Sequence, residues 1–138
     1  MESTSRHIVL MEDNPSDVFL FRRALDQHGM VYTLDVVSDG EKGMAILEEI
    51  ASGAAPVPDM VVLDLNLPRH DGIEVLERCR SLEVLRRMPV MILTSSDSPK
   101  ERERAEALQV TDFVRKPIVL DDFMALGGVI KKLLETVA

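Results

Sequence analysis

Three short runs of apolar residues constrain most strongly which fold this chain can adopt. They cover residues 8–11, 60–63 and 90–93, and polar or charged residues follow each of them closely. A continuous apolar run of this length is typical of a strand that is buried on both faces. Such strands occur in parallel sheets that helices cover on both sides. The sequence therefore predicts an α/β architecture.

Two further runs are only partly apolar. Residues 32–36 alternate apolar and polar side chains, and residues 112–116 contain only Phe113 and Val114 as an apolar stretch. Alternation indicates a strand that is exposed on one side. Because both segments are half-polar, both are expected at the edges of the sheet. Segments with helical spacing follow each of the five strands, beginning with the helix start at Asn14-Pro15.

The strand order follows from this ranking of apolar content. Placing the first, third and fourth strands in the middle, with right-handed crossovers, gives the flavodoxin-like order 2-1-3-4-5. We expect one (βα)5 doubly wound domain over residues 1–138, with a flexible segment at residues 1–6. Ligands in such sheets bind at the carboxyl ends of the strands, where the strand order reverses.

Charged and hydroxyl side chains follow four of the predicted strands. Glu12 and Asp13 end the first, Asp64 the third, Thr94 the fourth and Lys116 the fifth. Three neighbouring carboxylates repel one another, and a hard divalent cation with oxygen ligands, Mg²⁺ or Mn²⁺, would compensate them. A threonine hydroxyl and a lysine ammonium on the opposite side would bind an anionic group.

Composition argues against several classes of protein. The net charge of −8, without a cluster of Lys or Arg, argues against nucleic acid as a direct partner. No apolar run approaches the roughly 20 residues of a membrane span, and no signal peptide is evident. The single cysteine, Cys79, cannot form an internal disulfide, so we expect a cytoplasmic protein.

These spaced residues resemble those of a response-regulator receiver domain, and the resemblance covers nearly the whole chain. The segments that carry it are Glu12-Asp13, Asp64-Leu-Asn66-Leu-Pro68, Asp71-Gly72, Thr94 and Lys116-Pro117. The resemblance implies a signalling protein and not an enzyme, one that assists only its own phosphorylation and dephosphorylation. Asp64 would accept the phosphoryl group, in a two-component system or phosphorelay.

The resemblance also implies a role for each neighbour of Asp64. Asp13, Asp64 and the backbone carbonyl of Asn66 would bind Mg²⁺, or Mn²⁺, and Glu12 would act through a water molecule.

On the other side of the site, Thr94 would bond a phosphoryl oxygen and Lys116 would pair with it. The Lys116–Pro117 peptide is expected to be cis, and Phe113 falls at the position of the switch aromatic.

The chain most resembles phytochrome-associated regulators that consist of a stand-alone receiver, and we expect no output domain. The implied partners are a sensor histidine kinase, with a phytochrome-type kinase as one candidate, or a histidine phosphotransfer protein. Gly127-Gly128 would allow another backbone to approach closely. We therefore expect a homodimer through the face formed by residues 100–108, 112–116 and 120–137.

Three other functions remain open at this point. One is a module that has the receiver fold but binds its partners without being phosphorylated. An aspartyl-phosphate hydrolase of the haloacid dehalogenase type needs Asp-x-Asp-x-Thr, whereas this chain has Asn66 two residues after Asp64. Flavin binding needs a phosphate-binding first loop, which the acidic Glu12-Asp13 would oppose.

Overall fold

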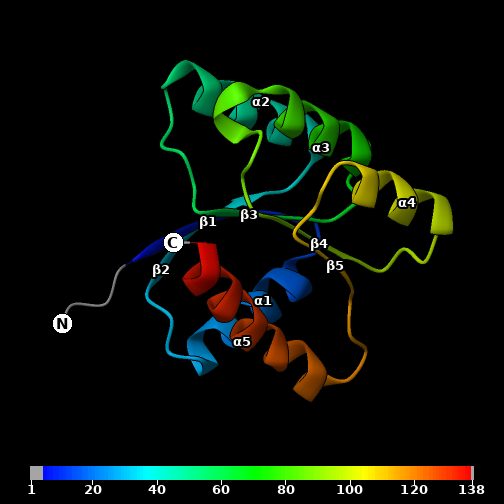
Figure 1. Cartoon of the computed structure of the whole chain (residues 1–138). Coiled ribbons are helices and arrows are strands. Elements are labelled where there is room, and N and C mark those ends of the chain that lie inside the picture. The colour runs from blue at the N-terminus through cyan, green and yellow to red at the C-terminus, as the bar shows by residue number, and fades with distance from the viewer. Residues whose placement is uncertain (1–4, 138) are drawn as a thin grey trace.

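Strands and helices alternate along the chain in the computed structural model, which describes residues 5–137 (Figure 1). The elements are β1 (Arg6–Met11), α1 (Pro15–Gln27), β2 (Tyr32–Val37), α2 (Gly40–Ser52), β3 (Met60–Leu63), α3 (Gly72–Ser81), the 3₁₀ helix η1 (Glu83–Leu85), β4 (Val90–Thr94), α4 (Pro99–Ala107), β5 (Asp112–Arg115) and α5 (Leu120–Val137). The described residues contain no helix that is long and apolar enough to cross a membrane.

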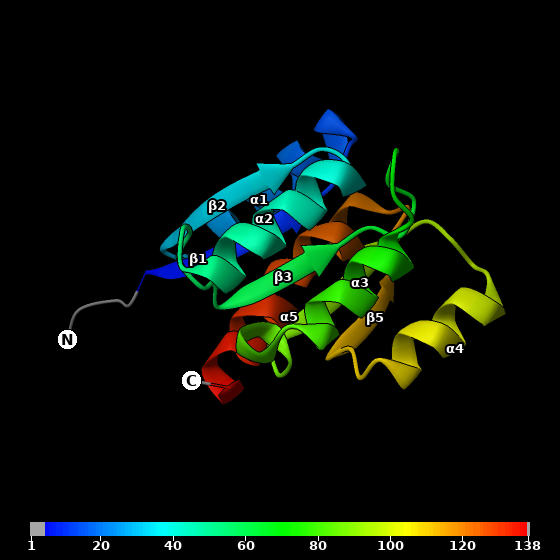
Figure 2. The same ribbon diagram turned by 90° about the horizontal axis from the view of Figure 1, so that it is seen from above.

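The five strands form one parallel sheet in the order β2-β1-β3-β4-β5. Helices α2, α3 and α4 cover one face, and α1 and α5 cover the other (Figure 1). The view from above shows strands of the sheet pointing in one direction beneath α2 and α3 (Figure 2). The predicted fold class and strand order are confirmed.

The sheet divides the core into two separate clusters. Side chains from alternate positions of the same strands enter different clusters: Val9 and Met11 face α2 and α3, whereas Ile8 and Leu10 face α1 and α5. This alternation is the period-2 geometry of a strand. All residues of β3 and β4 are buried, as their continuous apolar sequence predicts.

The glycine pair in α5 lies inside the molecule. A Cβ atom on Gly127 would come within 2.0 Å of the carbonyl oxygen of Ala24 in α1, and one on Gly128 would meet the ring of His28 at 3.0 Å. The pair thus lets α1 and α5 approach each other within one chain, and our inference of an intermolecular contact from it was wrong. Dimerisation through the α4–β5–α5 face stays a prediction.

Two local predictions are wrong. Arg6 belongs to β1, because its backbone N–H donates to the carbonyl of Val31 at 2.9 Å and strand pairing needs no apolar side chain. Residues 1–4 of the predicted flexible segment lie outside the described residues.

The Lys116–Pro117 peptide is trans, as are the other peptide bonds of residues 5–137. Trans is the lower-energy isomer even before proline.

The side chain of Arg80 joins two turns at the amino edge of the sheet. Its guanidinium group donates hydrogen bonds of 2.8–3.3 Å to the backbone carbonyls of Leu85, Arg86, Met88, Leu108 and Gln109. These carbonyls belong to the turn around η1 and to the carboxyl end of α4. The planar guanidinium can serve several carbonyls at once, so it stabilises both turns without a carboxylate partner.

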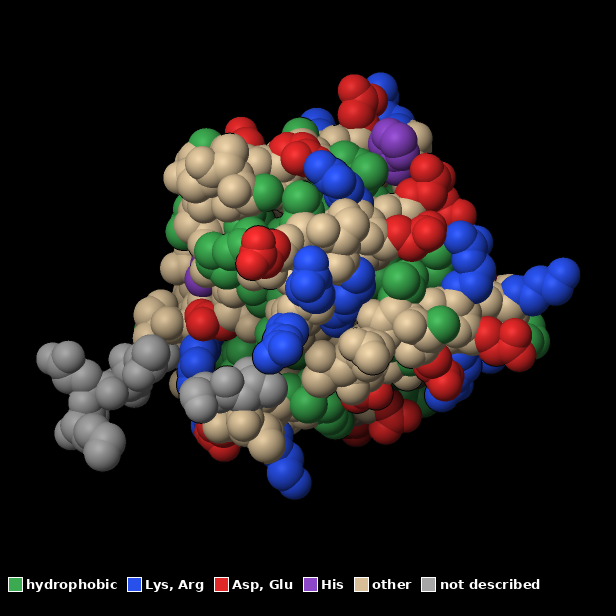
Figure 3. Space-filling model, turned by 45° about the horizontal axis from the view of Figure 1, so that its top comes forward, with side chains coloured by type: hydrophobic (Ala, Val, Ile, Leu, Met, Phe, Trp, Pro, Cys, Tyr) green, Lys and Arg blue, Asp and Glu red, His purple; other side chains and the backbone are tan. Residues whose placement is uncertain are grey.

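Surface ion pairs connect the helices of the α2–α3–α4 layer. Arg78 of α3 bonds Glu48 of α2 at 2.6 Å, and Arg104 of α4 approaches Glu77 of α3 at 3.4 Å. Figure 3 shows basic and acidic side chains next to one another on this side of the molecule. Exposed pairs of this kind contribute about 0–1 kcal/mol each, so apolar packing remains the main stabilising contribution.

Candidate functional site

Asp64 lies at the carboxyl end of β3, in the middle of the sheet. Its side chain is 4% exposed, and its backbone N–H donates to the carbonyl of Met11 at 3.0 Å. One carboxylate oxygen accepts the backbone N–H of Asn66 at 2.9 Å, and the other accepts from the ammonium of Lys116 at 2.9 Å. These two bonds compensate a charge that would otherwise be costly at this depth.

Glu12 and Asp13 meet Asp64 at this edge, as predicted. One carboxylate oxygen from each of the three residues lies within 4.8 Å of the others. Asp13 is exposed, whereas Glu12 and Asp64 are buried. A group of oxygen ligands without His or Cys fits a hard divalent cation such as Mg²⁺ or Mn²⁺. The part of Asn66 in metal binding stays a prediction.

The ammonium of Lys116 contacts Asp64 and is almost enclosed by carboxylates. Its ammonium nitrogen lies 2.6 Å from Glu12, 2.7 Å from Asp17 and 2.9 Å from Asp64. Its backbone N–H donates to the carbonyl of Thr94 at 2.7 Å, which fixes the residue beside β4. An ammonium group has three N–H donors, and here each has a carboxylate acceptor.

Burial and charge crowding shift two pKa values at the site. Burial raises the pKa of Glu12 to about 7; the hydrogen bond from Lys116 opposes this rise, and the charge of Asp64 adds to it. Burial works against the charged form of Lys116, but hydrogen bonds to Asp17, Glu12 and Asp64 outweigh it and raise the pKa of Lys116 above its usual range. A cation at the site would favour the charged form of Glu12.

Thr94 is fully buried at the end of β4, next to Asp64. Its hydroxyl oxygen accepts the backbone N–H of Ser96 at 3.2 Å and the side-chain amide of Asn66 at 3.4 Å. Its own proton can be offered to a further acceptor at the site. Asn66 and Ser96 therefore contact the hydroxyl that is predicted from the sequence to bind an anionic group.

Phe113 is half-buried in the edge strand β5, beneath α4. The guanidinium group of Arg102 lies over its ring, 5.3 Å from the centroid, which is a cation–π contact. Helix α4 has only Ala105 buried among its residues, so few apolar contacts hold it against the sheet. The predicted switch residue thus lies under a weakly packed helix.

The turn after Asp64 depends on a glycine. Asp71 caps the amino end of α3 by accepting the N–H of Ile73 at 2.9 Å. A Cβ on Gly72 would lie 2.5 Å from the Cα of Leu65 and 2.7 Å from the carbonyl oxygen of Asp64. The absence of a side chain therefore allows α3 to begin directly against the chain that carries Asp64.

The sequence prediction missed Asp17, which contacts Lys116. The available signal was its place three residues after Asn14, in the first turn of a helix that begins at the functional edge.

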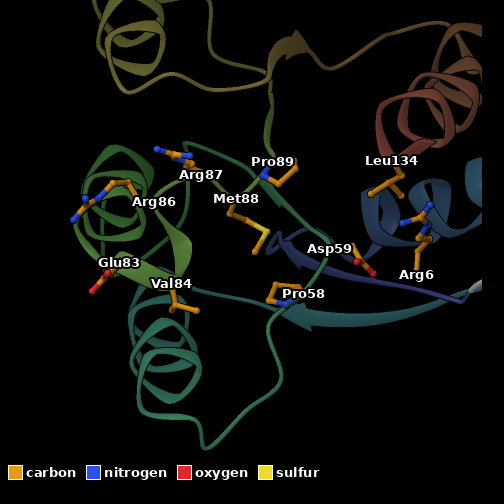
Figure 4. A pocket seen from close by; sticks show the side chains of 10 residues that line it. All are labelled: Arg6, Pro58, Asp59, Glu83, Val84, Arg86, Arg87, Met88, Pro89 and Leu134. Atoms are coloured by element: carbon orange, nitrogen blue, oxygen red, sulfur yellow. The ribbon is translucent and has the colours of Figure 1, made fainter. Parts of the chain in front are cut away.

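A hollow of about 590 Å³ lies away from these residues. Its lining includes Arg6, Asp59, Pro89 and Leu134, so it opens at the amino ends of the strands (Figure 4). The carboxylate of Asp59 already accepts the backbone N–H of His7 at 2.8 Å. Carboxylates, hydroxyl and ammonium converge at the other edge, so we place the chemistry there and not in this hollow.

Comparison with known proteins identifies the family of the chain. Residues 8–126 match the family described as "Response regulator receiver domain". The response regulator Rcp1 of Synechocystis is 33% identical over 132 residues, which are 94% of this chain and 90% of Rcp1.

Two solved structures resemble the whole fold. The phosphorylated cyanobacterial phytochrome response regulator RcpA has a TM-score of 0.86 at 31% identity, covering 98% of this chain and 97% of RcpA. The Mn²⁺-bound form of Rcp1 has a TM-score of 0.86 at 32% identity, covering 96% of this chain and 97% of that one.

Proposed function

Since the chain belongs to the response-regulator receiver family and has a role in phosphoaccepting two-component signalling, we propose that Asp64 is its phosphoacceptor. The observation that carries this proposal is the surroundings of the buried Asp64 carboxylate. This carboxylate forms a cluster with those of Glu12 and Asp13, and the Lys116 ammonium contacts both Asp64 and Glu12. A phosphate-independent module would need none of these contacts. Because the contacts are present, that module is the weaker alternative.

In the proposed reaction, a carboxylate oxygen of Asp64 forms a bond to phosphorus while the bond from phosphorus to the donor's histidine nitrogen breaks. The imidazole leaves with the electron pair and takes up a proton. Phosphoryl transfer depends mainly on positioning and on compensation of negative charge. Lys116 supplies a positive charge at 2.9 Å from Asp64, and the Thr94 hydroxyl donates to a phosphoryl oxygen.

We propose Mg²⁺ as the cation, with Mn²⁺ as a substitute, because receiver domains bind a divalent metal and a relative is described in its Mn²⁺-bound form. Asp13, Asp64 and the Asn66 carbonyl would hold it, and Glu12 would act through water. When bound, the cation neutralises charge on the phosphoryl oxygens.

The phosphoryl group would act as a switch through charge. It replaces a carboxylate by a group of about −1.5 to −2 with three acceptor oxygens. Its attraction for the Thr94 hydroxyl opens space towards which Phe113 can turn, away from Arg102. The two arrangements are populations of one fold, and the phosphoryl group favours one of them. The α4–β5–α5 face is the proposed output surface.

Incubation with acetyl phosphate and Mg²⁺ tests the proposed function. Intact-mass measurement is expected to show one phosphoryl group per chain, and none after removal of the metal with EDTA. An unmodified chain, under conditions in which a known receiver is modified, would overturn the proposal in favour of the phosphate-independent module.

A histidine kinase is the general partner of this family, and we propose an exposed apolar patch as the docking surface for the phosphohistidine donor. Phe19 of α1 is 61% exposed, Ile118 is 99% exposed and Leu120 is 58% exposed. Phe19 and Leu120 line one shallow hollow, and Ile118 follows Lys116 by two residues. Exposed apolar side chains grouped beside a reaction site are typical of a protein interface.

Replacing Phe19 with serine is expected to slow transfer from a phosphohistidine protein by about tenfold, the effect of losing one central interface residue. The rate with acetyl phosphate should stay within about twofold, because this donor needs no protein interface. Single-turnover transfer assays measure both rates.

Val57→Ser is the matched control, since Val57 is also apolar and 48% exposed but lies in the loop before β3, at the amino edge. Equal losses in Phe19→Ser and Val57→Ser would contradict the assigned surface.

Three expectations stay predictions: a phytochrome-type kinase as the cognate donor, a cytoplasmic location and the absence of enzymatic turnover.

A further inference from the structure

Three carboxylates share the Lys116 ammonium, and they differ in what else they do. Glu12 and Asp64 also belong to the group that fits a divalent cation, and Asp64 is the proposed phosphoacceptor. Asp17 lies outside that group. When a cation binds and a phosphoryl group arrives, Glu12 and Asp64 gain new partners, whereas Asp17 remains available only to Lys116.

Asp17 is held on a rigid element. It occupies the first turn of α1, which begins at Pro15 and is capped by Asn14, whose side chain accepts the N–H of Ser16 at 2.9 Å. The amino end of a helix favours a carboxylate. Phe21 and Leu25 anchor the same helix in the core, so the carboxylate has a fixed position relative to the sheet.

Lys116, in contrast, needs to be held. Its ammonium is carried on a flexible four-carbon chain with many rotamers, and its backbone lies just beyond the edge strand β5. Its side chain is 13% exposed and that of Asp17 is 21% exposed, so solvent only partly screens their 2.7 Å contact. This contact ties the lysine to α1, across the site from β5.

We propose that Asp17 is a positioning residue, which keeps the Lys116 ammonium beside Asp64 throughout the phosphorylation cycle. This inference rests on the proposed function of Asp64. Without Asp17, the ammonium has only Glu12 and Asp64 as partners. A cation must then compete with it for both carboxylates, and after transfer the lysine is less firmly placed against the phosphoryl oxygens. Both effects slow phosphorylation.

Asp17→Asn removes the charge and keeps the size of the side chain. Phosphorylation by acetyl phosphate at fixed Mg²⁺ is expected to slow by about tenfold, which corresponds to about 1.4 kcal/mol. Asp17→Ser, a second neutral variant, should show the same loss, and Asp17→Glu should recover part of the rate. The control is Asp122→Asn, which makes the same change in the first turn of α5 and should stay within about twofold.

A double-mutant cycle separates positioning from a general loss of negative charge. In a Lys116→Ala background, Asp17→Asn is expected to have no further effect on the phosphorylation rate, because its effect passes through the lysine.

A second measurement does not depend on phosphorylation. The Lys116 ammonium signal in ¹⁵N NMR should be sharp in the wild type and broadened by exchange in Asp17→Asn, but unchanged in Asp122→Asn.

Two results would overturn the assignment: a wild-type rate in both neutral variants, or the same tenfold loss with and without Lys116. Failure of the proposed function looks different, because then the wild-type chain itself would gain no phosphoryl group.

Discussion

Replacing Asp64 with asparagine is expected to abolish phosphorylation by acetyl phosphate in the presence of Mg²⁺. The amide has nearly the shape of the carboxylate, so it preserves packing at a position that is 4% exposed. It lacks the charged oxygen that attacks phosphorus, and it removes one of the three carboxylates available to the cation. Intact-mass measurement against time gives the result directly.

Asp59→Asn provides the control for this experiment. Asp59 directly precedes β3 and Asp64 directly follows it, so the same substitution is made at opposite ends of one strand. The amide oxygen introduced by this substitution can still accept the N–H of His7, and phosphorylation is expected at the wild-type rate. Equal modification of Asp64→Asn and the wild type would identify a different carboxylate as the acceptor.

Replacing Gly127 with alanine is expected to lower the free energy of unfolding by about 3 kcal/mol or more. The added Cβ would lie 2.0 Å from the backbone carbonyl oxygen of Ala24, which cannot turn aside as a side chain could. Helices α1 and α5 would have to separate, exposing apolar surface around Phe21 and Ile130. Urea denaturation monitored by circular dichroism measures the loss.

The neighbouring substitution Gly128→Ala is the matched control. The nearest atoms to its Cβ would be those of the His28 ring, at 3.0 Å, and alanine in a helix gains up to about 1 kcal/mol over glycine. The two effects oppose each other, so the stability should change by about 1 kcal/mol or less. Similar losses in both variants would show that helix propensity, and not the contact with α1, explains the glycines.

The order of the strands could be predicted because burial on two faces requires a different sequence from burial on one. Residues 60–63 and 90–93 are apolar throughout and lie in the middle, whereas residues 32–36 alternate and lie at an edge. The site followed from the same reasoning, since the carboxyl ends of parallel strands share one edge. Glu12, Asp64 and Lys116 therefore meet although they are far apart in sequence.

Features that depend on backbone or on side-chain reach could not be predicted. Arg6 joins β1 through its backbone, which leaves no apolar signal in the sequence. The contact of Asp17 with Lys116 spans 99 positions and depends on how α1 lies against the sheet. The glycine pair in α5 shows that something approaches closely, but the sequence does not say whether the approaching backbone belongs to the same chain.

The division of the core by a single sheet has a consequence for how such a protein can diverge. The cluster facing α1 and α5 shares no buried residue with the cluster facing α2, α3 and α4. Substitutions in the two clusters should therefore be nearly additive in stability. A lineage can then revise the α1 side, next to the proposed donor surface, without compensating changes beneath α4. The packing beneath α1 and the packing beneath α4 can therefore change at separate rates, whereas α5, which contributes to the proposed output face, shares its cluster with α1.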